Sequence, residues 1–417
     1  MNLSKPIELL LAKGVVIPQP FSVEIGEDVP TECISGDGVI LYPGTKIDGP
    51  DTVISSGVKL GHEGPVTIEN CQLGPDCELN AGFFRSSVFL EGSRMESGAH
   101  VREGCLLEEG AKAGHTVGLK QTILFPFVTL GSLINFCDCL MAGGTDSKNH
   151  SEVGSSYIHF NYTPQQDKAT ASLIGDVPRG VMLREQPIFL GGQGGLVGPA
   201  RIGYGTVTAA GIVFRGDCPE GGKLIAFGNV AHQDGAFHPG LYGSVNRRVQ
   251  NNLIYLANLL ALKEWYTHAR HPFFSGDAMG EPLYRGAQKT LERAFRERLK
   301  RLEELAEKMG GSLAAAGTYL EGEKRERAVR EQRTFLDQWP EIRGVFSHHI
   351  EESLGVEDRC LFLEELGKTA LKEGKYIPTI RALTPETVAV GERWLRHIVD
   401  GITTRTMACL TGKADKP

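Results

Sequence analysis

Residues 95–120 read Met-Glu-Ser-Gly-Ala-His-Val-Arg-Glu-Gly-Cys-Leu-Leu-Glu-Glu-Gly-Ala-Lys-Ala-Gly-His-Thr-Val-Gly-Leu-Lys, and this stretch decides the fold. Small or apolar residues recur in it at every sixth position: Met95, Val101, Leu107, Ala113 and Leu119. An α-helix repeats apolar residues about every 3.6 positions and an isolated strand about every second position. A period of six is typical of short strands separated by corners, so the stretch predicts coils of a parallel β-solenoid.

The same period continues on both sides of this stretch. It includes Leu41, Ile47 and Val53 before it and Leu190, Leu196, Ile202, Thr208 and Phe214 after it. Glycine makes up 52 of the 417 residues and often follows an aliphatic residue, where its lack of a Cβ permits a tight corner. A β-sandwich with recurring turns is the alternative, but a fixed period favours a repeat architecture. We therefore expect a mainly β fold with a solenoid over residues 31–217.

The sequence outside the repeat predicts three further parts. Residues 1–30 form an N-terminal cap, in which Leu9, Leu10 and Leu11 cover the first coil, because an open solenoid end exposes unpaired strand groups. Residues 218–244 form a connector that bears glycine and histidine. Residues 245–417 form an α-helical domain.

Apolar stripes at helical spacing mark the core-facing sides of that domain. They comprise Leu253, Leu256 and Leu260; Leu291, Phe295, Leu299, Leu302 and Leu305; and Trp394, Leu395, Ile398 and Ile402. The pair Gly310-Gly311 predicts the end of the middle helix. Thr384-Pro385-Glu386 predicts the N-cap and first turn of the last helix.

Composition narrows the function classes. The net charge is −7 without a long basic run, which argues against nucleic acid or an anionic membrane as the main partner. Nine cysteines without a Cys-x-x-Cys pair favour reduced thiols and a cytoplasmic location. Cys137 and Cys139 are too closely spaced for an ordinary zinc site, so we expect no structural metal. Neither a signal peptide nor an apolar run of membrane-spanning length is expected.

Several phrases of the repeat resemble those of a known family. Residues 101–114 read V-R-E-G-C-L-L-E-E-G-A-K-A-G, residues 118–121 read G-L-K-Q, and residues 153–164 read V-G-S-S-Y-I-H-F-N-Y-T-P. They resemble the left-handed β-helix of the hexapeptide-repeat acyltransferases, and most closely the acetyltransferase half of the bacterial bifunctional enzyme that makes UDP-N-acetylglucosamine. The resemblance covers roughly residues 35–217. It implies a left-handed parallel β-helix, a homotrimer and a site between subunits.

The resemblance also assigns roles to single residues. It matches Arg102, Lys120 and Lys168 to cations that hold a sugar phosphate. It matches Asn161 and Tyr162 to the junction of sugar and cofactor. For acetyl-CoA or another acyl-CoA it implies Ser155, Gly192 and Ala210. Three cations around one groove fit a phosphate or pyrophosphate independently of the resemblance, since charge-assisted hydrogen bonds to such oxygens are strong.

The catalytic base is open at this stage. The family uses a histidine in the phrase A-G-H, and Ala113-Gly114-His115 has this form, but the gap-free register places Ser132 at the histidine's position. A serine is not a base near neutral pH without a helper. His115, one coil away, and His150 and His159, beside the irregular stretches 141–152 and 163–171, are the candidates.

The set of cations favours two functions over a third, a scaffold whose helical domain recruits a partner. One is an acyl- or acetyltransferase-like enzyme that binds a phosphosugar or a nucleotide sugar such as UDP-N-acetylglucosamine in a cationic groove. The alternative is a non-catalytic protein that binds the nucleotide sugar through a degenerate site. The solenoid begins almost at the N-terminus, without the Gly-rich strand–loop–helix unit of the family's other half, so uridylyltransferase activity is not expected.

Overall fold

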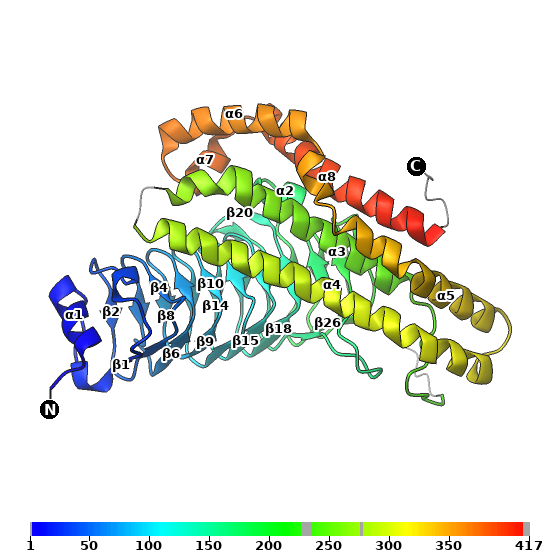
Figure 1. Ribbon diagram of the computed structural model, residues 1–417, viewed down its shortest axis with the longest axis horizontal. Coiled ribbons are helices and arrows are strands. Elements are labelled where there is room, and N and C mark those ends of the chain that lie inside the picture. Colours follow the sequence, from blue (N-terminus) through cyan, green and yellow to red (C-terminus); the bar gives the residue numbers. More distant parts are fainter. Residues whose placement is uncertain (1, 227–234, 276–277, 412–417) are drawn as a thin grey trace.

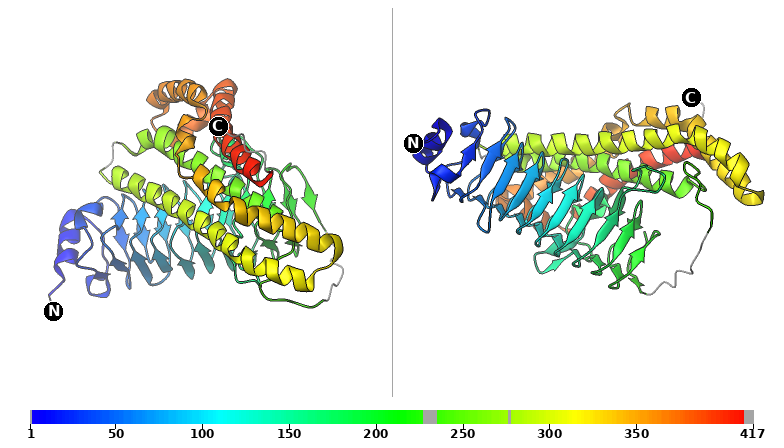
Figure 2. Two further views of the ribbon diagram at one scale, coloured as in Figure 1. Left: turned by 45° about the vertical axis from the view of Figure 1, so that its right-hand side comes forward. Right: turned by 90° about the horizontal axis from the view of Figure 1, so that it is seen from below.

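The computed structural model describes residues 2–226, 235–275 and 278–411, and it has two parts that lie side by side (Figure 1). One is a parallel β-solenoid, and the other is a layer of helices that runs along one side of it (Figure 2). The expected fold, a left-handed parallel β-helix followed by an α-helical C-terminal region, is confirmed. None of the described helices is both long and apolar enough to cross a membrane.

Each full coil of the solenoid contributes one short strand to each of three parallel sheets. Sheet A contains β2 (Ile40–Leu41), β5 (Lys59–Leu60), β8 (Glu78–Leu79), β11 (Arg94–Met95), β14 (Lys112–Ala113), β17 (Thr129–Leu130), β22 (Glu152–Val153), β25 (Phe189–Leu190), β28 (Val207–Thr208) and β30 (Leu224–Ile225). Sheet B contains β1 (Glu24–Ile25), β3 (Lys46–Asp48), β6 (Val66–Glu69), β9 (Gly82–Arg85), β12 (Ala99–Val101), β15 (Val117–Lys120), β18 (Ile134–Cys137), β23 (Ile158–Phe160), β26 (Gly195–Val197) and β29 (Val213–Phe214). Sheet C contains β4 (Val53–Ile54), β7 (Gln72–Leu73), β10 (Val88–Phe89), β13 (Leu106–Leu107), β16 (Ile123–Leu124), β19 (Cys139–Met141), β24 (Ser172–Ile174) and β27 (Arg201–Ile202).

The period of six corresponds to one step from sheet to sheet. Met95 lies in sheet A, Val101 in sheet B and Leu107 in sheet C, after which Ala113 pairs with Met95 one coil on. All of these side chains point into the solenoid and are at most 3% exposed. The strands extend beyond the expected range of 31–217, because β1 pairs with β3 and β30 pairs with β28 without continuing the sequence period.

The N-terminal cap contains α1 (Lys5–Lys13), which ends at Gly14 in the left-handed conformation. Leu10 is fully buried, whereas Leu9 and Leu11 are exposed, so only one of the three leucines expected to cover the first coil does so. Two single turns follow, η1 (Pro20–Ser22) and η2 (Thr31–Cys33). The expected connector lies partly outside the described residues, which omit 227–234.

The interruptions of the period form distinct structures. Residues 141–152 contain the antiparallel hairpin of β20 (Gly144–Asp146) and β21 (Asn149–His150). Residues 161–171 form a loop, and residues 177–187 contain the short helix α2 (Val177–Gly180).

The helical layer consists of six α-helices linked by short turns in the described part of the chain. They are α3 (Asn246–Trp265), α4 (Gly280–Tyr319), α5 (Gly322–Val345), α6 (Val356–Glu373), α7 (Tyr376–Ala382) and α8 (Pro385–Thr411), with the turns η3 (Tyr266–Arg270), η4 (His271–Phe274) and η5 (Ile350–Ser353). The start of α8 is confirmed, since Thr384 Oγ1 accepts a hydrogen bond from Thr387 N at 3.2 Å. The predicted helix end at Gly310-Gly311 is wrong: α4 continues to Tyr319. Burial of Met309, Ser312 and Ala316 outweighs the intrinsic cost of about 1 kcal/mol for each glycine.

Sheet C is the sheet that carries this layer, with α4 packed on β7 and β10 and α3 on β24. Its outward-facing residues form an apolar ladder, and they are buried as completely as the inward-facing ones. The ladder consists of Val88, Leu106, Ile123, Leu140 and Leu173, paired from coil to coil. Gly286 of α4 approaches β7 so closely that a Cβ would lie 2.4 Å from Gln72 Oε1.

Candidate functional site

The turns between sheet A and sheet B place five of the expected site residues in one row. His115, Ser132, Ser155, Gly192 and Ala210 follow β14, β17, β22, β25 and β28 in successive coils. Main-chain hydrogen bonds join the turns; for example, Ser156 N donates to Ser132 O at 2.8 Å and Gln193 N to Ser155 O at 2.8 Å. We call this row the A/B corner.

The first two members of the A/B corner are in direct contact. His115 Nδ1 lies 2.8 Å from Ser132 Oγ, at the surface of the solenoid. Ser132 N in turn donates to Ser155 Oγ at 3.1 Å. The serine that takes the expected place of the base therefore has an imidazole within hydrogen-bond distance.

The other two candidate histidines have different surroundings. His150 lies in the hairpin, where its Nδ1 is 3.3 Å from Ser151 O. His159 points into the solenoid and is 1% exposed, with Nδ1 2.6 Å from Cys137 O and Nε2 2.7 Å from Ser172 Oγ. Burial lowers the pKa of His159 to about 4, so the ring stays neutral. Because both nitrogens are bonded inside the coil, the structure argues against His159 as the base.

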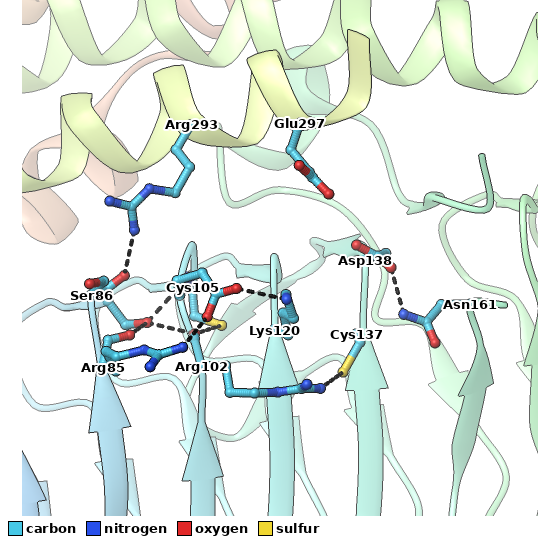
Figure 3. A network of polar contacts seen from close by, with 12 residues as sticks. Arg85, Ser86, Arg102, Cys105, Lys120, Cys137, Asp138, Asn161, Arg293 and Glu297 are labelled. Carbon is cyan, nitrogen blue, oxygen red and sulfur yellow. Dashed lines mark hydrogen bonds and ion pairs between the residues drawn. The ribbon is translucent and has the colours of Figure 1, made fainter. Parts of the chain in front are cut away.

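The turns between sheet B and sheet C hold a second row, the B/C corner, which contains Arg85, Arg102, Lys120 and Asn161 (Figure 3). Glu103 lies between two of its cations, with Oε1 2.7 Å from Lys120 Nζ and Oε2 3.1 Å from Arg85 Nη2. Burial alone would raise the pKa of Glu103, but the hydrogen bonds from Lys120 and Arg85 lower it to about 2. Arg102 is exposed, and its Nη2 lies 3.9 Å from Cys137 Sγ.

The B/C corner continues into a buried ion pair with α4. Asp138 Oδ1 lies 2.7 Å from Arg298 Nη2, and the two side chains are 5% and 3% exposed. Asp138 Oδ2 accepts a hydrogen bond from Asn161 Nδ2 at 2.6 Å. The side chain of Asn161 is thus oriented by a helix that the sequence resemblance does not include. Figure 3 also shows Arg293 and Glu297 of α4 pointing towards this corner, and Arg293 Nη1 donates to Ser86 O at 3.4 Å.

The helical layer also fixes the loop that carries Tyr162 and Lys168. Asp167, which is 4% exposed, accepts from Tyr242 Oη at 2.9 Å and from Arg248 Nη1 at 3.2 Å. Lys308 Nζ donates to the carbonyl of Gln166 at 2.7 Å. Tyr162 remains exposed, and Lys168 has no ion-pair partner among the described residues. No contact joins Lys168 to Arg102 or Lys120 in the part of the chain that the structure describes.

Most of the expected residues therefore lie in two rows, one on each side of sheet B, whereas His150, His159, Tyr162 and Lys168 lie outside them. His115 and Lys120 are five positions apart on the same coil, which corresponds to at most about 17 Å at ~3.3 Å per strand residue. The outward face of sheet B lies between them and presents Ile158, Phe160 and Val213, which are 42%, 41% and 39% exposed. The two rows are therefore separated by the width of sheet B on a single chain.

The A/B corner is compatible with an acyl-CoA. Ser155 and Ala210 are exposed and Gly192 is partly exposed, so main-chain groups and one hydroxyl are accessible along the row. A Cβ at Gly192 would lie 2.8 Å from Ser155 O, so this position requires its glycine. The described residues contain no group of three metal-ligating side chains.

Sequence reasoning missed several residues of the B/C corner. Arg85 and Glu103 share the corner with Lys120, yet only Lys120 was expected. Their signal is the spacing, since Arg85, Arg102 and Lys120 lie 17 and 18 residues apart, one coil each. Arg298 had no signal in the sequence, because its position relative to Asp138 depends on how α4 docks.

Comparison with known proteins supports the resemblance. No protein-family profile matches the chain. It is 28% identical over 222 residues to the bifunctional protein GlmU of Thermotoga maritima, covering 52% of this chain and 43% of that protein. The GlmU proteins of Pelobacter propionicus and Carboxydothermus hydrogenoformans are 29% and 26% identical over 223 and 219 residues, again covering 52% of this chain and 42% and 44% of theirs. The chain spans less than half the length of these relatives. Together with the solenoid, these matches confirm the resemblance to hexapeptide-repeat acetyltransferases.

Proposed function

We propose that this protein transfers an acetyl group from acetyl-CoA to the amine or a hydroxyl of a sugar phosphate or nucleotide sugar. The contact between His115 Nδ1 and Ser132 Oγ carries the proposal, because it restores a base at the position where the resemblance expects one. The similarity to the GlmU proteins supports the reaction class.

The two side chains act as a proton relay. In the tautomer with an unprotonated Nδ1, His115 accepts the proton of the Ser132 hydroxyl, while Ser132 Oγ accepts the proton of the attacking amine or hydroxyl. Acetyl-CoA supplies the thioester, whose carbonyl carbon bonds to the nucleophile while its C–S bond breaks. His115 then donates its proton to the leaving thiolate. Ser155, bonded to the main chain of Ser132, keeps the serine in place.

The B/C corner binds the phosphate groups of the substrate. Arg102 is exposed with no carboxylate partner in the described chain, so its guanidinium is available for two parallel hydrogen bonds to phosphate. Lys120 and Arg85 share the single carboxylate of Glu103, which leaves this corner with excess positive charge.

We infer that the two rows on opposite sides of sheet B act together across two copies of the chain. A homotrimer that packs through the solenoids would bring the B/C corner of one copy towards the A/B corner of the next. The apolar side chains of Ile158, Phe160 and Val213 on the face between the rows favour such self-association, since exposed apolar patches mark contact surfaces. Light scattering tests the assembly, and a monomer that retains full activity would contradict it.

A thiol-release assay with acetyl-CoA and glucosamine 1-phosphate tests the reaction. We expect turnover in the wild type and a loss of roughly 10²- to 10⁴-fold in kcat for His115→Ala. His62→Ala is the matched control, because Leu60-Gly61-His62 occupies the same corner three coils earlier and its ring packs on Tyr42. Arg102→Ala should raise KM for the sugar phosphate with little change in kcat. Absence of turnover, or equal rates for His115→Ala and His62→Ala, would refute the proposal.

A further inference from the structure

The apolar ladder of sheet C ends in a charged residue. From Val88 to Leu173, the outward position of each coil holds a buried aliphatic side chain, and the helical layer packs on the first and last of these strands through α4 and α3. On the last strand of the sheet, β27, the register places Arg201 at this position, directly beside Leu173. A cation at the position that holds an aliphatic side chain on the five preceding strands of sheet C departs from the local pattern, and such departures are expected at functional sites.

The side chain of Arg201 makes no hydrogen bond or ion pair among the described residues. Its Nε atom is buried and lacks an acceptor, although its main-chain nitrogen bonds to Asp217 Oδ1 at 2.9 Å. The neighbouring Arg179 differs, since its guanidinium lies 2.5 Å from Asp176 Oδ2 and 4.7 Å from the ring of Tyr204. A buried donor without an acceptor costs free energy and calls for an explanation.

A cavity of about 460 Å³ lies where Arg201 meets the helical layer. Leu173 and Ile202 of the solenoid and Val399 of α8 supply its apolar lining, and α2 and α3 close its sides. Thr403 of α8 also lines it, and Thr403 Oγ1 is a second buried polar atom without a partner. This volume falls within the ~300–1,000 Å³ typical of small-molecule sites.

The charges around the cavity indicate the kind of ligand. Its lining contains three guanidinium groups and two carboxylates, and one of the guanidinium groups, Arg396, pairs with Glu392 outside the lining at 3.7 Å. Arg179 and Asp176 neutralise each other, while Arg201 and Asp400 have no ion-pair partner in the part of the chain described. One free cation suits a single carboxylate better than a doubly charged phosphate, and a free carboxylate suits an amino or hydroxyl donor.

We propose that this cavity binds a small organic acid that carries one carboxylate and an amino or hydroxyl group. The ligand's carboxylate accepts hydrogen bonds from Arg201 and the Thr403 hydroxyl, its donor faces Asp400, and its carbon body packs on Leu173 and Val399. The site is separate from both corners, because it opens on the side of sheet C. Since its walls come from the last coils and from α8, the ligand fastens the helical layer to the solenoid.

Substitution of Arg201 by leucine tests the proposal without knowledge of the natural ligand. Arg201→Leu restores the apolar ladder, so it should raise the Tm of the ligand-free protein. Arg215→Leu is the matched control, because Arg215 is an exposed arginine of the next coil outside the cavity lining, and it should leave the Tm unchanged. A lower Tm for Arg201→Leu would show that the guanidinium is structural and would overturn the proposal.

Calorimetric titration of the full-length protein tests the ligand class directly. The probes are two acids, L-leucine and L-lactate. L-leucinamide is the comparison compound for L-leucine, and inorganic phosphate is the comparison compound for L-lactate. We expect saturable binding of at least one acid, at least tenfold weaker binding of its comparison compound, and loss of binding in Arg201→Leu but not in Arg215→Leu. Failure of both acids to bind, equal binding to Arg201→Leu, or tighter binding of phosphate would each contradict the proposal. None of these outcomes depends on acetyl transfer.

Discussion

Removing the guanidinium of Arg298 should cost far more stability than removing another guanidinium two residues away. Arg298 Nη2 lies 2.7 Å from Asp138 Oδ1, and both side chains are almost fully buried. Arg296 Nε lies 2.6 Å from Glu292 Oε1, but these side chains are 76% and 36% exposed. The two pairs have similar distances on the same helix, so they differ mainly in their access to water.

The burial of each ion pair determines how much unfolding free energy is lost when its arginine is replaced. Arg298→Met leaves the Asp138 carboxylate buried without its cation, which costs about 3–5 kcal/mol. Arg296→Met removes an exposed pair worth about 0.5 kcal/mol or less. The double variant Asp138→Asn/Arg298→Met should recover most of the loss, since no buried charge remains and asparagine tolerates the left-handed backbone at position 138, where φ is 60°.

Urea unfolding of the three variants and the wild type measures these free energies, and an unchanged m-value shows that the same transition is compared. Equal losses for Arg298→Met and Arg296→Met would refute the reasoning. So would a double variant as unstable as Arg298→Met, because the cost would then come from lost packing of α4 instead of an unpaired charge.

Three further changes have predictable effects. Burial raises the pKa of Glu108 from 4.5 to about 7, although Arg270 acts in the opposite direction. The folded protein therefore binds the carboxyl proton more tightly than the unfolded chain does. Its free energy of unfolding falls as the pH rises from 4.5 to about 7. Glu108→Gln should flatten this fall, measured by thermal unfolding from about pH 5 to 8; parallel curves would contradict it. Gly310→Ala should stabilise the protein by about 1 kcal/mol, because position 310 lies within α4 and an added Cβ would contact no other atom. A lowered Tm would disprove this. Thr384→Ala should destabilise by about 1 kcal/mol through loss of the α8 cap, and Thr384→Ser should retain the wild-type Tm.

The solenoid was predictable because its period is local in the sequence. Met95, Val101 and Leu107 each face the interior, and a spacing of six along the chain is enough to place them. The docking of the helices was missed, although paired apolar residues such as Leu106-Leu107 and Ile123-Leu124 recur once per coil in sheet C. Such pairs are buried on both faces and so indicate which sheet another layer covers.

The candidate site was predictable only in part. Register along the repeat placed Ser132 and His115 on the same corner, but their contact depends on side-chain directions that a motif does not contain. His159 could have been excluded from the alternation of β23, where Ile158 and Phe160 point outward and the residue between them points in. Arg298 and Arg201 act through contacts between distant segments, for which single-sequence patterns carry no signal.

The docking of α4 along sheet C has a consequence for how this protein can change in evolution. Gly286 meets Gln72 of β7, and Arg298 meets Asp138 at the start of β19, four coils further on. Twelve helical residues span about 18 Å, and four coils span about 19 Å. The helix and the solenoid thus span nearly the same distance, although the rise per helical residue and the spacing between coils differ.

One coil corresponds to about 3.2 helical residues, which is not a whole number. Insertion of a coil therefore cannot be matched by an insertion in α4 without turning the far end of the helix, and Arg298 with it, away from its partner. Solenoids ordinarily gain and lose repeats without penalty to the remaining coils. The fixed length of α4 therefore restricts insertions and deletions of whole coils between β7 and β19.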